Sequence, residues 1–117
     1  MINVKKKGNK GENEFANWLF SHGFKAWRNG SSGAGMYKGD INNSMDCTFE
    51  IKTVKSLNLK KAWRQTEKDA SIAKNSPILA VHFDGMGQNK WLIVQHSEDW
   101  IEDRKKLSTL TRITNIY

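Results

Sequence analysis

The stretch FEIKTVKS, residues 49–56, places a carboxylate and an ammonium group two residues apart in a run that otherwise has the composition of a buried strand. Successive side chains of a strand point to opposite faces, so we expect the apolar side chains on one face of a sheet and Glu50 and Lys52 together on the other. Removing charges from water is costly unless they are paired or bind a metal. The pair is therefore either a surface feature of an exposed sheet face or part of a functional site.

The length and composition predict one globular domain, residues 1–117. With 38% hydrophobic and 26% charged residues the chain can form a single core, and no apolar run approaches the ~20 residues that a membrane span requires. The basic start lacks an apolar stretch followed by a cleavage site, and the lone Cys47 cannot form an internal disulfide. These features predict a cytoplasmic protein without a membrane partner, in which Cys47 fills the core.

The net charge of +7 favours polyanionic partners, because a polyanion releases counterions when cationic side chains bind it. Nucleic acid is the leading candidate, although lysine-rich surfaces also serve solubility. The basic residues are dispersed along the chain, as in KKKGNK, KTVKSLNLKKAWR and EDRKKL. This dispersal indicates a basic surface on a folded domain and argues against a disordered basic arm.

The N-terminal half predicts one helix followed by short strands. Apolar residues at helical spacing define the helix, and glycines and asparagines mark its end and the turns between strands. The predicted segments are a helix over Lys10–His22 that stops at Gly23, a strand over Phe24–Arg28, a glycine-rich loop over residues 29–39, and a hairpin over Asp40–Val54 that turns near Asn42 and Asn43.

The C-terminal half predicts two further helices and two strands. The resulting order α-β-β-β-α-β-β-α is typical of an α/β or α+β protein in which helices pack on a sheet. The predicted segments are a helix over Leu59–Lys74, strands over Pro77–Phe83 and Lys90–Gln95, a helix that starts at Ser97 with Glu98 and Asp99 in its first turn and Lys105 and Lys106 in its last, and a tail over residues 110–117 that is either a last strand or a partner-docking arm.

Three acidic residues occupy unusual positions in this pattern. Glu12 precedes Phe15 and Ala16 by three and four residues, which aims a carboxylate at the packed face of the first helix. Asp40 leaves the glycine-rich loop at the start of a strand, and Glu50 lies with Lys52 on the next strand. Taken singly, each has an ordinary explanation: a helix-dipole partner, a turn residue and a surface ion pair, respectively.

Taken together, an Asp followed by E-x-K on the next strand and then a helix is the pattern of the PD-(D/E)XK nuclease superfamily. Two carboxylates with the backbone carbonyl of Ile51 between Glu50 and Lys52 form an all-oxygen site suited to Mg²⁺. The ammonium group of Lys52 can orient or help to deprotonate the attacking water. As a bare pattern, D-x9-E-x-K also recurs by chance.

A longer resemblance runs from Lys7 to Ala73. The segments KGNKGENEFANWLFSHGFKAWRNGSSG, GDI, FEIK and RQTEKDASIAK resemble the archaeal-type Holliday junction resolvase family and its phage relatives. The residue before Asp40 is Gly39 where the family usually has Pro, the connection from Asp40 to Glu50 is short for the family, and the region after Lys74 has no motif match. The resemblance implies a catalytic set of Glu12, Ser32 (with Ser31 in reserve), Asp40, Glu50, Lys52 and Gln65, and metal binding by Asp40, Glu50, Ile51 and Glu12.

The resemblance further implies a restriction-endonuclease-like α/β fold with a central mixed sheet flanked by helices. The implied function is a homodimeric, metal-dependent endonuclease of bacterial, archaeal or phage origin that resolves DNA four-way junctions with Mg²⁺, or alternatively Mn²⁺. The other readings are a PD-(D/E)XK nuclease of repair, restriction or homing type and a non-catalytic DNA-binding protein. No nucleotide cofactor is expected, because GSSGAG lacks the Lys and Ser/Thr of a phosphate-binding loop. The predicted DNA contacts are Lys5, Lys6, Lys7, Lys10, Arg28, Ser31, Ser32, Lys38, Lys55, Lys60, Lys61 and Arg64.

Overall fold

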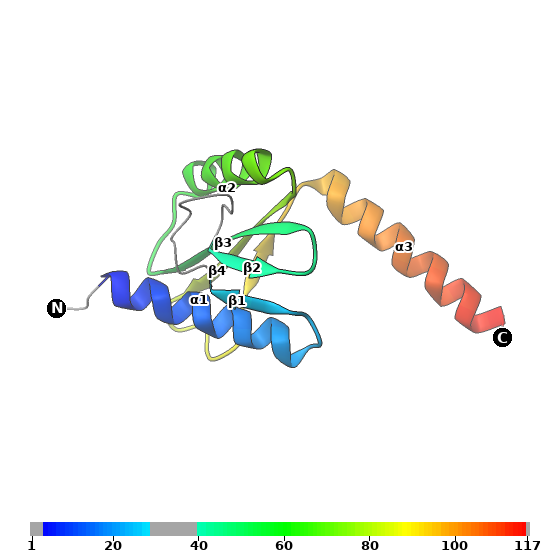
Figure 1. Ribbon diagram of the computed structural model, residues 1–117, viewed down its shortest axis with the longest axis horizontal. Coiled ribbons are helices and arrows are strands. Elements are labelled where there is room, and N and C mark those ends of the chain that lie inside the picture. Colours follow the sequence, from blue (N-terminus) through cyan, green and yellow to red (C-terminus); the bar gives the residue numbers. More distant parts are fainter. Residues whose placement is uncertain (1–3, 29–39, 117) are drawn as a thin grey trace.

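The computed structural model describes residues 4–28 and 40–116, with side chains described for residues 8–28 and 40–111. Along the chain the elements follow the order α-β-β-β-α-β-β-α that the sequence predicts (Figure 1). Their bounds are α1 Val4–Ser21, β1 Ala26–Arg28, β2 Ile41–Asn43, β3 Cys47–Val54, α2 Leu59–Ala73, β4 Ser76–Phe83, β5 Leu92–Val94 and α3 Ser97–Ile116.

A three-stranded mixed sheet in the order β3-β4-β5 forms the centre of the fold. The long strands β3 and β4 pair in parallel from Cys47↔Ser76 to Val54↔Phe83, and β5 is antiparallel to β4. The parallel pairing requires a crossover between β3 and β4, which α2 supplies. Beside this sheet, β1 and β2 form a separate antiparallel ribbon. Within the three-stranded sheet, β3 is therefore an edge strand.

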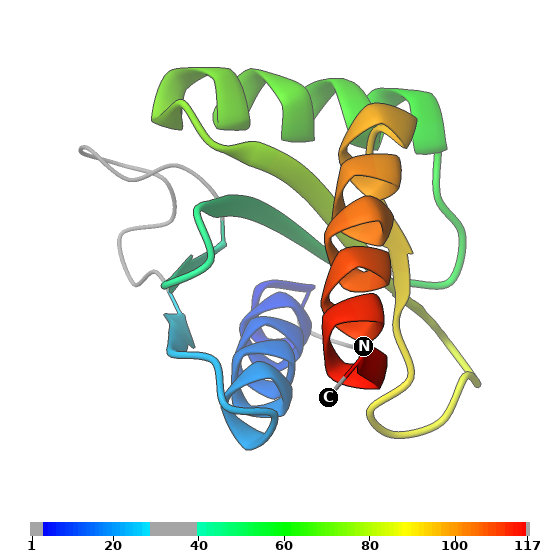
Figure 2. The same cartoon turned by 90° about the vertical axis from the view of Figure 1, so that its right-hand side faces the viewer.

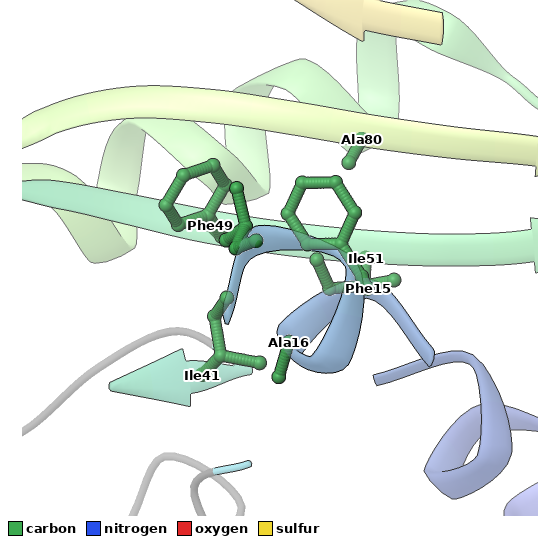
Figure 3. Packing of buried hydrophobic residues seen from close by; sticks show 7 residues of the cluster. Phe15, Ala16, Ile41, Phe49, Ile51 and Ala80 are labelled. Carbon is green, nitrogen blue, oxygen red and sulfur yellow. The ribbon is translucent and has the colours of Figure 1, made fainter. Parts of the chain in front are cut away.

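The sheet lies between two helices, with α1 on one face and α2 on the other (Figure 2). On the α1 face, Phe15 packs between Phe49, Ile51 and Ala80 in the main core (Figure 3). On the α2 face, a smaller cluster is formed by Ala62, Leu79 and Val81. Alternate residues of β4 thus serve opposite faces, as a strand covered on both sides requires.

Local sequence accounts for the ends of the first two helices. Gly23 has φ +92° after α1, and the N–H groups of Gly23 and Phe24 donate to the carbonyls of Phe20 and Leu19, which closes the last turn. Asn58 caps α2 by accepting a hydrogen bond from the N–H of Lys61 at 3.1 Å. Lys74, the last residue of the predicted helix, adopts the left-handed conformation that ends α2.

Two predicted boundaries in the N-terminal half need correction. Helix α1 begins at Val4, six residues before the prediction, because Gly8 and Gly11 do not interrupt it. The hairpin prediction for Asp40–Val54 was wrong in its pairing and its turn. Strand β2 pairs with β1, in the register Arg28↔Ile41, and the chain turns after Asn43, whose side chain bonds the backbone of residues 45 and 47.

The C-terminal helix differs most from the prediction. It continues through residues 110–116, so the tail is not a strand, and Lys105 and Lys106 lie in the middle of α3. The prediction of a partner-docking arm stays a prediction. No Gly or Pro follows Gly87, and the helix therefore meets no residue that would stop it. In Figure 1, α3 projects away from the body of the protein. The longest dimension of the whole protein, α3 included, is 57 Å. Among the described residues, no helix is long and apolar enough to cross a membrane.

Candidate active site

Glu50 and Lys52 lie on the same face of β3, as their spacing predicts. The Nζ atom of Lys52 is 3.4 Å from an Oε1 atom of Glu50, and the two side chains are 36% and 12% exposed, respectively. The parallel register places Glu50 beside Leu79, whose side chain packs toward α2. The charged pair therefore occupies the α2 side of the sheet, at its β3 edge.

Asp40 joins this pair through the backbone of β3. Its N–H donates to the carbonyl of Phe49 at 2.9 Å, and its Oδ2 atom accepts a hydrogen bond from the N–H of Ile51 at 2.6 Å. Because the N–H and C=O of a strand residue point to the same side, the carbonyl of Ile51 faces the same edge. The two predicted metal-binding carboxylates and the predicted carbonyl ligand thus converge at one edge of β3.

Glu12 reaches the site from α1 and is held by Arg28. The Nε atom of Arg28 donates to Oε2 of Glu12 at 2.9 Å, and its Nη2 atom donates to Oδ1 of Asn9 at 2.9 Å. The close approach of α1 to β3 depends on Gly11, since a Cβ atom there would lie 2.5 Å from Cγ2 of Thr53. Sequence reasoning missed Asn9, which lies one residue before the predicted start of the helix and carries no motif that indicates binding to Arg28.

The electrostatics of the site raise the pKa values of Asp40 and Glu50. Burial, followed by the negative charge of Glu50, raises the pKa of Asp40 to about 7, although the hydrogen bond from Ile51 opposes the rise. Burial also raises the pKa of Glu50; Lys52 opposes that rise, and the negative charges of Asp69 and Glu12 add to it. A cation that binds beside such desolvated carboxylates stabilises their charged form.

The donor set fits a hard divalent cation. Asp40 and Glu50 offer carboxylate oxygens and Ile51 a carbonyl oxygen, which are the ligands that Mg²⁺ accepts while it keeps several waters. Among residues 4–28 and 40–116, no group of three or more His, Cys, Asp or Glu side chains stands ready to hold a metal ion. Glu12, the third carboxylate predicted to bind the metal, is paired with Arg28.

Gln65 lies on α2 and bonds Asp69 one turn further along. Its Nε2 atom is 3.2 and 3.1 Å from the two carboxylate oxygens of Asp69. Sequence reasoning missed Asp69, although the QTEKD segment already set the two residues four positions apart on one helix face.

The basic residues predicted to bind DNA are distributed over several elements. Lys10 on α1 pairs with Glu14 at 3.8 Å, Arg28 is engaged by Glu12 and Asn9, and Lys55 is exposed at the end of β3. On α2, a hollow of about 320 Å³ is lined by Asn58, Lys60, Lys61, Arg64, Gln65 and Lys68, of which Lys68 was not predicted. The side chains of Lys5, Lys6 and Lys7, and the whole of Ser31, Ser32 and Lys38, lie outside the described residues.

Comparisons with known proteins show which fold and family this chain resembles. The structure resembles that of the Holliday junction resolvase of the archaeal hyperthermophile Archaeoglobus fulgidus, with 22% sequence identity and a TM-score of 0.55 over 76% of this chain and 72% of that one. The likeness confirms the predicted fold class. No curated protein sequence matches the chain.

A family model for the archaeal Holliday junction resolvase (Hjc) matches residues 3–113. The match includes α3, where the sequence offered no motif, and it confirms the resemblance seen in the N-terminal segments. Enzymes of this family generally depend on a divalent metal ion. The chain therefore belongs to the archaeal Holliday junction resolvase family, whose members are structure-specific endodeoxyribonucleases that act on four-way junctions.

Proposed function

We propose that this chain resolves four-way DNA junctions as a homodimer, using Mg²⁺ bound at the edge of β3. The observation that carries the proposal is the convergence of Asp40 and Glu50 beside Lys52, with Ile51 offering its carbonyl between them. Asp40, Glu50 and Ile51 would bind the ion, and Glu12 would complete the acidic site directly or through water. Mn²⁺ is the alternative ion, since it takes the same oxygen ligands.

In the proposed reaction, a water oxygen attacks phosphorus, the bond to the 3′ oxygen breaks, and that oxygen takes up a proton. A bound divalent ion would polarise the phosphate and lower the pKa of water. Lys52, at 3.4 Å from Glu50, orients the water and offsets negative charge that develops in the transition state. From the family we expect products with a 5′-phosphate and a 3′-hydroxyl. Because the substrate is branched DNA, the enzyme would act inside the cell.

The hollow on α2 supports a path for the DNA backbone next to the carboxylates. Its four cationic side chains form no ion pair with any described acidic group, so their charge is available to phosphates. Arg28, in contrast, donates hydrogen bonds to Glu12 and Asn9 through Nε and Nη2. It would contact DNA only through its remaining N–H groups. We also propose that Ser32, or alternatively Ser31, contacts the backbone of the DNA strand that is cut. This part of the proposal concerns the loop over residues 29–39.

Apolar surface on β5 and α3 supports the dimer. Leu92 and Ile93 of β5 are about half exposed, and α3 carries Trp100 at 49% and Leu107 at 54% exposure. In contrast to α1 and α2, α3 packs on neither face of the sheet (Figure 1). Two symmetric cuts require two active sites, which a two-fold dimer supplies, and such interfaces bury ~800 Å² per partner.

A gel assay tests the function directly. Purified protein is incubated with a four-way junction, a matched linear duplex and single strands, each with Mg²⁺ or EDTA, and with the Asp40→Asn variant as a control for contaminating nuclease. We expect Mg²⁺-dependent cleavage of the junction alone. Equal cleavage of the duplex would indicate a repair or restriction type of nuclease, and binding without cleavage would indicate a non-catalytic DNA-binding protein.

A further inference from the structure

The chemistry of a carboxylate fixes the orientation of the Gln65 side chain. Ionised Asp69 can only accept hydrogen bonds, and both of its oxygens lie within 3.2 Å of Nε2 of Gln65. The NH₂ end of the Gln65 amide must therefore face Asp69, since a reversed amide would bring two acceptors together. The carbonyl oxygen of Gln65 is left facing away from Asp69, and within the described part of the chain it accepts no hydrogen bond.

The pair lies on one side of α2, at the basic hollow. Gln65 lines the hollow, while Ala62, Thr66 and Ala70 of the same helix are buried against the sheet. Glu67, on the opposite side of α2, faces His96 beyond β5 at 3.0 Å. Gln65 and Asp69 therefore lie on the side of α2 nearer β3, the strand that carries Glu50 on its α2-facing side. A phosphate in the hollow would accept hydrogen bonds from the lysine and arginine side chains. The carbonyl oxygen of Gln65, at the border of the hollow, cannot donate to a phosphate and therefore suits a group that donates an O–H.

We propose that Asp69 is a positioning residue, which fixes the amide of Gln65 so that its carbonyl oxygen accepts a hydrogen bond from the water that attacks the scissile phosphate. This inference rests on the proposed function. It gives Asp69 a role distinct from the metal binding proposed for Asp40 and Glu50, because its carboxylate accepts hydrogen bonds from the Gln65 amide. Orienting a water molecule acts on turnover more than on DNA affinity.

An i,i+4 pair of this kind also stabilises a helix on its own, and the test must separate the two roles. Asp69→Asn and Asp69→Ala remove the same charge, but only asparagine keeps an acceptor for Gln65. We expect kcat to fall about tenfold in Asp69→Ala and by no more than ~3-fold in Asp69→Asn, with KM unchanged in both. Equal losses of kcat in the two variants would overturn the proposal and point to the charge itself, as would a change in KM alone.

A double-mutant cycle tests whether Asp69 acts through Gln65. Gln65→Ala is expected to lower kcat about as much as Asp69→Ala, and the double variant no further. If the kcat loss in the double variant equals the product of the two single losses, the two residues act independently. That result would overturn the proposal. Glu67→Gln is the matched control, because it removes one negative charge from the same helix at a residue that faces His96 at 3.0 Å; its kcat should equal that of the wild type.

A second readout is independent of cleavage. In ¹⁵N–¹H spectra, the side-chain NH₂ signals of Gln65 are identified by their loss in Gln65→Ala. They should move toward unbonded values in Asp69→Ala and stay in place in Glu67→Gln. Unchanged signals in Asp69→Ala would overturn the pairing. Wild-type protein that cuts no junction would overturn the proposed function, while these spectra still report on the Gln65–Asp69 pair.

Discussion

The carboxylate of Asp40 accepts a 2.6 Å hydrogen bond from the backbone N–H of Ile51. Together with the bond from its own N–H to the carbonyl of Phe49, this contact fastens Asp40 to the main chain of β3. One predicted metal ligand is therefore held by the very strand that carries the other, Glu50. The geometry of the site depends on strand backbone, which is more rigid than a contact between two side chains.

Neutralising either carboxylate should abolish cleavage but not DNA binding. Asp40→Asn and Glu50→Gln keep the size of the side chains and remove the charge that would hold the ion, while they also reduce repulsion of phosphate. We expect cleavage to fall at least ~10³-fold, in line with the loss of transition-state stabilisation on the order of 4 kcal/mol, and junction affinity to stay equal or rise. Cleavage rates in Mg²⁺ and binding measured in EDTA check this. Substantial cleavage by one variant would exclude that residue as a ligand.

The metal-free protein should lose stability as the pH rises. The pKa of Asp40 is raised from 3.8 to about 7 in the folded state, so between these pH values the folded protein binds more protons than the unfolded chain. The free energy of unfolding must then fall as the pH increases from about 4 to about 7. Denaturant unfolding in EDTA at several pH values measures the trend. The slope should be smaller in Asp40→Asn, and identical slopes would contradict the assignment.

Two glycines of α1 should respond oppositely to alanine. A Cβ atom at Gly11 would collide with Thr53, whereas one at Gly8 meets nothing within 4 Å. We expect Gly8→Ala to raise the free energy of unfolding by ~0.5–1 kcal/mol through helix propensity. Gly11→Ala should lower it by ~1–2 kcal/mol and slow cleavage, because α1 must move and carries Glu12 with it. Denaturant unfolding and junction cleavage of the two variants test this; equal behaviour would show that the close approach is unimportant.

The hollow on α2 should contribute to the salt dependence of junction binding. Each phosphate contact releases ~0.9 counterion, so Arg64→Ala and Lys68→Ala should each weaken binding and lower the slope of log K against log salt concentration by about that amount. Lys105→Ala on α3 is the control, since its ammonium group pairs with Glu102 at 3.1 Å. Binding isotherms at several salt concentrations measure this slope. If Lys105→Ala weakens binding as much as Arg64→Ala and Lys68→Ala, the effect comes from the net charge of the protein and not from the hollow.

Ile101 on α3 should be needed for the dimer. It is 43% exposed, and an aspartate there would place a charge in the proposed interface. At micromolar concentration we expect the wild type to sediment as a dimer and to linearise a cruciform plasmid, and Ile101→Asp to sediment as a monomer and to give mostly nicked circles. Phe20→Asp changes a residue that is 68% exposed on α1 and should retain the dimer. A wild-type monomer that only nicks would rule out the paired cleavage.

Features set by local pattern were predictable from the sequence, and those set by distant contacts were not. The spacing of Glu50 and Lys52 on one strand predicted their shared face, and the stop at Gly23 followed from its backbone freedom. The partner of β2 was not predictable, because short polar strands carry no signal for one neighbour over another. Asp69 was missed for a similar reason, since its relation to Glu50 arises only when α2 packs on β3. The length of α3 was underestimated because its Thr and Ile residues favour strands in isolation.

Because Asp40 is bonded to the backbone of β3, its distance from Glu50 in space does not depend on the number of residues between them. Its two hydrogen bonds use the backbone atoms of residues 49 and 51, and therefore make no demand on the residues between β2 and β3. That turn can gain or lose residues without moving the carboxylate, which explains how a connection shorter than usual for the family is compatible with the same site. In this chain, the number of residues between Asp40 and Glu50 therefore does not determine how far apart their side chains lie.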